Sequence, residues 1–226
     1  MSSMGVFDIL GPIMIGPSSS HTAGAARLGK VARIIAGDDV VEVTFLLHGS
    51  FGKTYKGHGT DRALVAGIMG MDPSDERLRD SLEIAKEKKI KITFKDVDLG
   101  DYHPNTVKFL MKLKNGRECE VIGCSIGGGN IEIVEINGNQ VKFTGTYSTI
   151  ITSHKDIPGT VAKVTNILYD SDVNIAFLTL GRSQKGKNAT MTFEVDGKIS
   201  EDLIEEIKKV NGIEKVIYIN KIEDGE

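Results

Sequence analysis

The sequence is poor in cysteine and contains no long apolar run. Two cysteines, Cys119 and Cys124, among 226 residues exclude a disulfide scaffold and indicate a reducing compartment. They are also too few to ligate an iron–sulfur cluster or a cysteine-rich zinc site. No apolar run approaches the ~18 residues that a membrane helix requires. Residues 1–8 lack a basic region ahead of an apolar stretch, so we expect no secretory signal, a cytoplasmic location and no membrane partner.

Charge is also nearly balanced. The chain carries 28 Lys plus Arg and 31 Asp plus Glu, a formal net charge of −3. This balance gives no electrostatic reason to expect a nucleic acid as partner. Hydrophobic residues make up 40% and charged residues 26% of the chain, which is ordinary for a globular protein and argues against disorder. The length suggests one or two domains.

The 26 glycines, in contrast, are numerous and clustered. They concentrate in 11–29, 49–70 and 127–129, where turns with positive φ or close approach to a ligand are expected. Periodicity around them predicts helices over 22–36, 60–69 and 74–89, the last capped by Ser74, and strands over 40–47, 90–94, 107–113, 118–125, 131–136 and 141–144. Asn137-Gly138 predicts a type I′ hairpin. Residues 1–145 are expected to form a loop-rich α+β domain.

The remaining residues, 146–226, alternate more regularly. Strands are predicted over 147–152, 173–180, 189–195 and 216–219, and helices follow the Pro158-Gly159 break and the cap Ser200. The order βαββαβ over about 75 residues is typical of a split-βαβ, ferredoxin-like unit. We place the domain boundary near Gly145.

A candidate site lies at the start of the first predicted helix, in Gly16-Pro17-Ser18-Ser19-Ser20-His21-Thr22. Hydroxyls and free backbone N–H groups at a helix N-terminus form a cradle for a carboxylate or phosphate. His21 adds a group that titrates near neutral pH. The simpler interpretation is that Ser19, Ser20 or Thr22 is the N-cap and His21 an exposed loop residue. One cap, however, explains one hydroxyl and not the whole cluster.

Two further segments place a histidine among turn residues. The second predicted helix opens with Gly57-His58-Gly59-Thr60-Asp61-Arg62. This segment could form a functional site. The alternative is an ordinary helix start, in which Thr60 is the N-cap and Asp61 complements the helix dipole. His103-Pro104-Asn105 forms a polar turn between strands. Metal binding by His21, His58 and His103 is conceivable. None of them has a second histidine or carboxylate at helical ligand spacing, so acid–base or substrate-binding roles are favoured.

Together these segments resemble the beta chain of bacterial iron–sulfur-dependent L-serine dehydratase. The resemblance extends over nearly the whole chain and rests on residues 7–12, 16–22, 57–63, 103–105 and 125–129. The tail, with His154, Asp156 and Pro158-Gly159, is similar to an ACT domain. The resemblance also implies that the first domain is like the allosteric substrate-binding domain of some phosphoglycerate dehydrogenases.

The resemblance implies deamination of L-serine to pyruvate and ammonia with a [4Fe–4S] cluster held by a partner alpha chain, which agrees with the two cysteines here. A cluster iron lacking a protein ligand would act as a Lewis acid on the serine hydroxyl, while a base removes the α-proton and an anion site holds the carboxylate. On this resemblance His21, His58 and Asn105 lie nearest the substrate. The residues expected to bind it are Ser18, Ser19, Ser20, Thr22, Gly57, Thr60 and Asp61. The base could be either histidine or a group of the alpha chain.

The similarity to ACT domains implies regulation. Effectors of such domains commonly bind the loop between the first strand and helix, often across a dimer, and here that loop is 154–160. His154, Asp156 and Gly159 are the candidate effector-binding residues, with L-serine as the expected effector. The alternative is that Pro158-Gly159 only marks a helix entry. We also expect homodimerisation through this domain.

Two rival functions stay open at this point. A stand-alone amino-acid sensor would use both modules to bind small ligands and would be a colourless homodimer that binds serine. A metal-dependent hydrolase built on the three histidines would hold stoichiometric zinc. Co-purification with a cysteine-bearing partner and a brown chromophore would favour the dehydratase.

Overall fold

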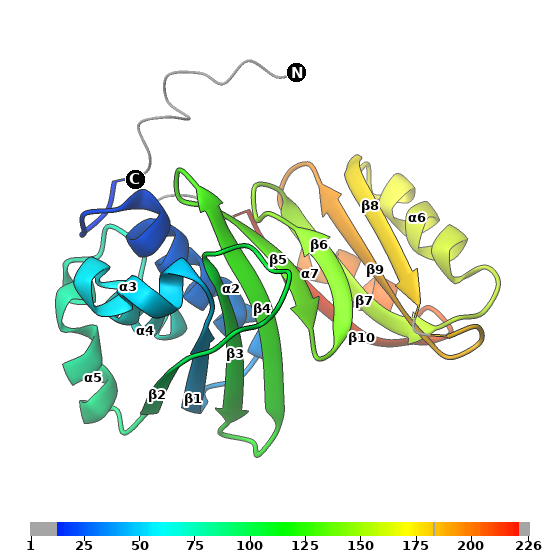
Figure 1. The fold of residues 1–226 in the computed structure, drawn as a ribbon. Helices are drawn as coiled ribbons and strands as arrows, with labels where there is room; N and C mark the ends of the chain where they lie inside the picture. The colour runs from blue at the N-terminus through cyan, green and yellow to red at the C-terminus, as the bar shows by residue number, and fades with distance from the viewer. Residues whose placement is uncertain (1–12, 183, 222–226) are drawn as a thin grey trace. The chain divides into compact units, whose positions relative to one another are not determined.

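The computed structural model describes residues 13–182 and 184–221 (Figure 1). The chain forms two compact units, one ending at Asn137 and the other beginning at Gly138. The boundary predicted near Gly145 would place strand β6 (Asn139–Phe143) in the first unit. The division between Asn137 and Gly138 places this strand in the second unit. The domain ranges 1–145 and 146–226 stay a prediction from the sequence.

The first unit contains a mixed sheet with the strand order β2-β1-β3-β4-β5. Its strands are β1 (Val40–Leu47), β2 (Lys91–Asp96), β3 (Thr106–Leu113), β4 (Glu118–Gly127) and β5 (Asn130–Ile136). β1 and β2 pair in parallel, and the other neighbours are antiparallel. Phe45, Phe109 and Val121 are fully buried register partners on one face of the sheet. This face forms the core of the unit.

Helices of the first unit pack on that face. They are the π-helical turn η1 (Ser19–Gly24), α2 (Ala25–Ala36), α3 (Ser50–His58), α4 (Thr60–Ile68), the 3₁₀ turn η2 (Glu76–Asp80) and α5 (Ser81–Glu87). α2 ends at Ala36, and its C-cap Gly37 has a left-handed backbone with φ of 70°, a conformation that glycine adopts readily. A Cβ added to Gly123 of β4 would lie 2.7 Å from the Leu28 side chain of α2. Glycine at this position therefore lets α2 lie close against the sheet.

Two helix predictions in this unit are wrong. The helix expected over 74–89 is split into η2 and α5, and its cap is Asp75, which accepts a hydrogen bond from the backbone N–H of Arg77, rather than Ser74. Ser81, at the break, is buried and donates its hydroxyl to the carbonyl of Arg62 at 2.8 Å, a tertiary contact that periodicity does not reveal. The glycine-rich residues 50–58, expected among turns, form α3.

The second unit has the predicted βαββαβ order. Its elements after β6 are β7 (Ser148–Lys155), α6 (Thr160–Asp170), β8 (Ile175–Arg182), β9 (Asn188–Val195), α7 (Glu201–Lys208) and β10 (Ile213–Ile219). The sheet is antiparallel with the order β10-β7-β9-β8. Ser200 caps α7 by accepting from the backbone N–H of Leu203 at 3.3 Å, as predicted. Positive φ values of 49° at Asn137 and 77° at Gly138 agree with the predicted I′ turn.

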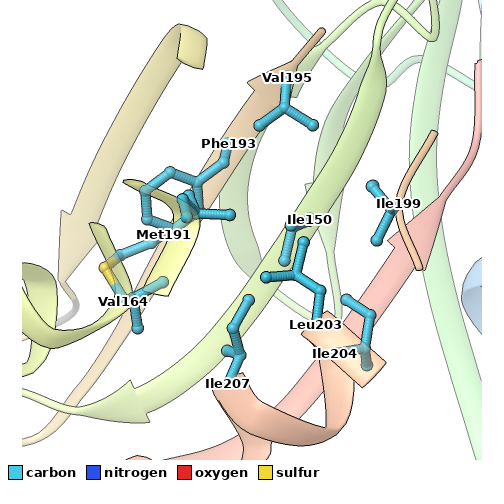
Figure 2. Close-up of a cluster of buried hydrophobic side chains, with 10 residues drawn as sticks. Ile150, Val164, Met191, Phe193, Val195, Ile199, Leu203, Ile204 and Ile207 are labelled. Carbon is cyan, nitrogen blue, oxygen red and sulfur yellow. The ribbon is translucent and has the colours of Figure 1, made fainter. Parts of the chain in front are cut away.

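One face of this second sheet carries the core of the unit (Figure 2). Ile150 of β7, together with Met191 and Phe193 of β9, meets apolar side chains of α6 and α7. The helix residues buried in this cluster are Val164, Leu168, Leu203, Ile204 and Ile207. In both helices the apolar residues thus lie on one side, and this side faces the sheet.

Candidate functional site

The serine-rich segment at 18–22 forms a π-helical turn rather than a regular helix start. Ser18 is its N-cap, with an extended backbone, and its Oγ accepts a hydrogen bond from the backbone N–H of His21 at 3.2 Å. The interpretation that Ser19, Ser20 or Thr22 is the cap is therefore wrong, because those residues lie within η1. Single π turns are rare and occur frequently at functional sites.

The His21 ring is held between two hydroxyl groups and meets a second histidine. Its Nδ1 lies 3.4 Å from Ser18 Oγ, and its Nε2 lies 3.3 Å from Ser50 Oγ at the start of α3. The His21 and His58 ring centroids are 4.9 Å apart, and Phe51 contacts His21 edge-on at 5.2 Å. Burial, and secondarily the neighbouring His58, lower the pKa of His21, which favours its neutral form. The structure thus brings together the histidines of two distant motifs.

His58 ends a helix instead of opening one. It is the last residue of α3, and Gly59, with φ of 71°, joins α3 directly to α4. The Thr60 side chain does not cap α4, so the alternative that Thr60 is the N-cap is also wrong. The Thr60 hydroxyl is buried and has no hydrogen-bond partner among the described residues. Asp61 accepts from the backbone N–H of Arg62 at 2.8 Å, and burial raises the pKa of its carboxyl.

The third motif adjoins the same region through its backbone. Pro104 O accepts from the Phe51 N–H at 3.3 Å, which ties the 103–105 turn to the start of α3. Asn105 O accepts from the Ser125 N–H at 3.0 Å. Within the described part of the chain, however, the Asn105 side chain makes no hydrogen bond to either histidine. The backbone of the 103–105 turn thus adjoins the site, and the contact of Asn105 with substrate stays a prediction.

A cavity of about 360 Å³ opens beside the histidine pair. It is lined by the predicted site residues Thr22, Gly57 and His58 and also by Ile15, Gly16, Pro17, Lys56, Gly59, Arg62, Leu78 and Arg79. The cavity is therefore built from η1, the α3–α4 junction and η2, which are separated in sequence. Its basic side chains were not predicted as site residues.

Three buried hydroxyls around η1 lack hydrogen-bond partners within residues 13–182 and 184–221. They belong to Thr22, Thr60 and Ser125, each at most 1% exposed. Ser125 Oγ lies where a Cβ on Gly24 would be, so glycine there makes room for it. A buried hydroxyl without a partner is unfavourable, which indicates that these groups are positioned for a ligand or bound water. Ser50 and Ser125 were not predicted as site residues.

The cysteines do not suit metal ligation. Cys119 and Cys124 lie on β4 and are only 4% and 5% exposed. Burial, and secondarily Glu132, raise the pKa of Cys124 to about 11, which disfavours the thiolate that metals bind. Among the described residues no group of three or more His, Cys, Asp or Glu side chains is placed to hold a metal ion.

The loop expected to bind an effector is occupied by internal contacts. His154 is 2% exposed, and burial lowers its pKa. Asp156 accepts from the Gly186 N–H at 2.9 Å and from Arg182 Nη1 at 3.0 Å, contacts that lower its pKa. Gly159 begins α6 with φ of 90°. Both contacts of Asp156 use its Oδ2 atom.

The chain resembles known proteins over both units. The family model "Serine dehydratase beta chain" matches residues 5–135, and the "ACT domain" model matches 148–212. The N-terminal unit and the ferredoxin-like unit thus define a serine-dehydratase-type chain with an ACT domain, which confirms the predicted α+β fold class.

Full-length relatives make the assignment specific. The probable L-serine dehydratase beta chain of Bacillus subtilis is 43% identical over 99% of this chain and 100% of its own length. The L-serine dehydratase beta chain of Peptoniphilus asaccharolyticus is 43% identical over 97% and 99%. A D-3-phosphoglycerate dehydrogenase of Methanocaldococcus jannaschii is 26% identical over 91% of this chain and 39% of its own. The chain belongs to the serine dehydratase beta chain family. No helix among the described residues is long and apolar enough to cross a membrane.

Proposed function

We propose that this chain is the beta subunit of a two-chain L-serine dehydratase that converts L-serine to pyruvate and ammonia. The observation that carries the proposal is the His21–His58 pair, with centroids 4.9 Å apart, beside a cavity that Thr22 and His58 line. Identity of 43% to two chains bearing that name, over nearly the full length, supports the choice of substrate. On this proposal L-serine binds in the cavity.

The reaction requires loss of the α-proton and of the β-hydroxyl as water, followed by hydrolysis of the resulting enamine to pyruvate and ammonia. His58 is exposed, and its ring has no hydrogen-bond partner in the described part of the chain, so its nitrogens are available for proton transfer. Both ring nitrogens of His21 lie within hydrogen-bond distance of serine hydroxyls, and these contacts hold the His21 ring in the orientation in which it faces His58. Thr22 lines the cavity, and we assign its buried hydroxyl, which has no partner among the described residues, as a donor to the substrate carboxylate.

On this proposal the [4Fe–4S] cluster belongs to the partner alpha chain. The donors here do not fit a cluster, because both thiols are buried and the pKa of Cys124 is raised to about 11. This chain therefore contributes binding and proton transfer. The partner supplies the metal chemistry.

The proposal is tested by serine-dependent pyruvate formation after anaerobic reconstitution with the alpha chain. We expect His58→Ala to lower turnover at least tenfold. Lys53→Ala, an exposed residue on the same helix outside the cavity, serves as the control and should leave turnover unchanged. Unchanged activity of His58→Ala would remove its catalytic role. A chain that binds serine but forms no pyruvate after reconstitution with the alpha chain would instead favour the amino-acid sensor.

We further propose that the ACT domain regulates the enzyme by binding L-serine and by pairing with a second copy. Strand β8 is an edge of its sheet, and Phe177, Leu178 and Leu180 on it are 57%, 43% and 54% exposed. Exposed apolar side chains on an edge strand are typical of an interaction surface. Sedimentation of the full chain tests this: Leu180→Glu should shift a dimer toward monomer, and a monomeric native chain contradicts it. Absence of heat on titrating millimolar L-serine would contradict effector binding.

A further inference from the structure

The cavity beside His58 is surrounded by positive charge that the proposed substrate does not need. Lys56 in the last turn of α3, Arg62 in α4 and Arg79 in η2 all line it, and no Asp or Glu does so. None of these three side chains forms an ion pair within the described residues. Asp61, adjacent to Arg62, is half-buried and offsets only part of the charge.

A second observation also indicates a ligand. Thr22 lines the same cavity and is 1% exposed, and its buried hydroxyl has no hydrogen-bond partner among the described residues. Glycine at position 16 lets the Thr22 side chain pack against the backbone, because a Cβ there would collide with Thr22 Oγ1. The cavity wall thus combines three cations that form no ion pair among the described residues with a residue whose buried hydroxyl has no partner there. Donors without acceptors are complementary to an oxyanion.

The charge balance selects the class of anion. L-Serine is a zwitterion with one carboxylate and one ammonium group, and its ammonium would find no carboxylate in the cavity wall. Three cations match a doubly charged anion with several oxygen acceptors. A cavity of about 360 Å³ is large enough for a small ester as well as for the free ion. We propose that this cavity binds a phosphate-class dianion, either inorganic phosphate or a small phosphate monoester, through Lys56, Arg62, Arg79 and the Thr22 hydroxyl.

Such binding would affect the proposed reaction. His58 lines the same cavity, so a bound dianion would occupy space beside its ring and compete with L-serine. This regulatory consequence rests on the proposed function, whereas the binding itself does not. We expect the dianion to act as a competitive inhibitor that raises KM for serine and leaves kcat unchanged.

Isothermal titration calorimetry of the full chain at low ionic strength, with inorganic phosphate and O-phospho-L-serine as probes, tests the binding. We expect Arg62→Gln and Arg79→Gln each to weaken binding at least tenfold. Arg77→Gln is the matched control, because Arg77 shares η2 with Arg79, pairs with Asp75 at 2.5 Å and lies outside the cavity wall. It removes the same charge and should keep the affinity. Tighter binding of the ester would identify a monoester ligand, and equal binding would identify the phosphate group alone.

Thr22→Val provides a variant that preserves side-chain shape. Because the hydroxyl has no protein partner, we expect weaker phosphate binding without loss of thermal stability. Absence of heat with both probes at millimolar concentration would overturn the proposal, as would an equal loss of affinity in Arg77→Gln. Chains that bind phosphate but form no pyruvate after reconstitution would refute only the proposed function. Active enzyme from a chain that does not bind phosphate would refute only this inference.

Discussion

Replacing Gly67 with alanine should force apart the two helices that support the site. α2 and α4 pack through glycines, and a Cβ on Gly67 would collide with the carbonyl oxygen of Ala26 and lie 2.8 Å from the Cα of Gly29. Both obstacles are backbone atoms, so no side-chain rotation can relieve the contact. The helix axes themselves must separate.

The expected cost follows from two opposing effects. Alanine in a helix interior is favoured over glycine by about 1 kcal/mol. Overpacking costs about 1–3 kcal/mol, and a backbone obstacle places Gly67 near the upper end of that range. The net loss in the free energy of unfolding is therefore about 2 kcal/mol, which corresponds to a fall in melting temperature of roughly 5–10 °C for the affected unit.

Gly57→Ala is the matched control. Gly57 is also in a helix, α3, but a Cβ there would meet no atom within 4 Å. This variant should gain up to about 1 kcal/mol. Urea and thermal unfolding followed by circular dichroism would compare the two variants with the unaltered chain. A Gly67→Ala chain that melts at or above the native temperature would refute the close approach of α2 and α4.

Two further predictions concern titratable groups. In a Cys119→Ser variant at mildly alkaline pH, Cys124 should react slowly with a disulfide reagent until the chain unfolds, because its pKa is about 11; rapid native-state labelling would contradict this. The pKa values of His21 and His154 are lowered from 6.5 in the folded chain, so both histidines bind protons more readily in the unfolded chain than in the folded chain. The free energy of unfolding is therefore retained above pH 6.5 and falls as the pH decreases from 6.5 toward the pKa values of the folded chain. The urea midpoint should fall over that window, and less so in His21→Gln; a midpoint that rises on acidification is the opposing result.

The sequence was sufficient to predict an element of the fold where one local signal dominated. Residues 40–47 form the predicted strand because six of the eight are apolar and four are β-branched. It was insufficient where tertiary contacts override local preference. α3 contains glycines that disfavour a helix, yet Gly52 leaves room there for the Asp96 carboxylate, which a Cβ would displace. Such a requirement is visible only once β2 is in place.

The site shows the same limit. Glycine and helix-start signals singled out His21 and His58, but their contact depends on η1 and α3 packing side by side. Arg79 could not be assigned to the site, because it reaches the cavity from η2, a segment predicted as part of a longer helix. In the second unit the Asp156–Arg182 pair depends on how β8 follows from the α6 crossover. Long-range geometry of this kind carries no local sequence signature.

The side chains at the cavity and the two cysteines are consistent with one distribution of roles between this chain and the proposed partner. His21 is held by two serine hydroxyls, and the exposed His58 ring stands at the cavity, so the groups suited to binding and proton transfer are present. The two thiols are buried, and Cys124 is held protonated, so the groups suited to a cluster are not. On our proposal the elimination needs both sets, so the cavity at His58 would face the partner chain that would hold the metal. The basic side chains around it would then control which anions reach that junction.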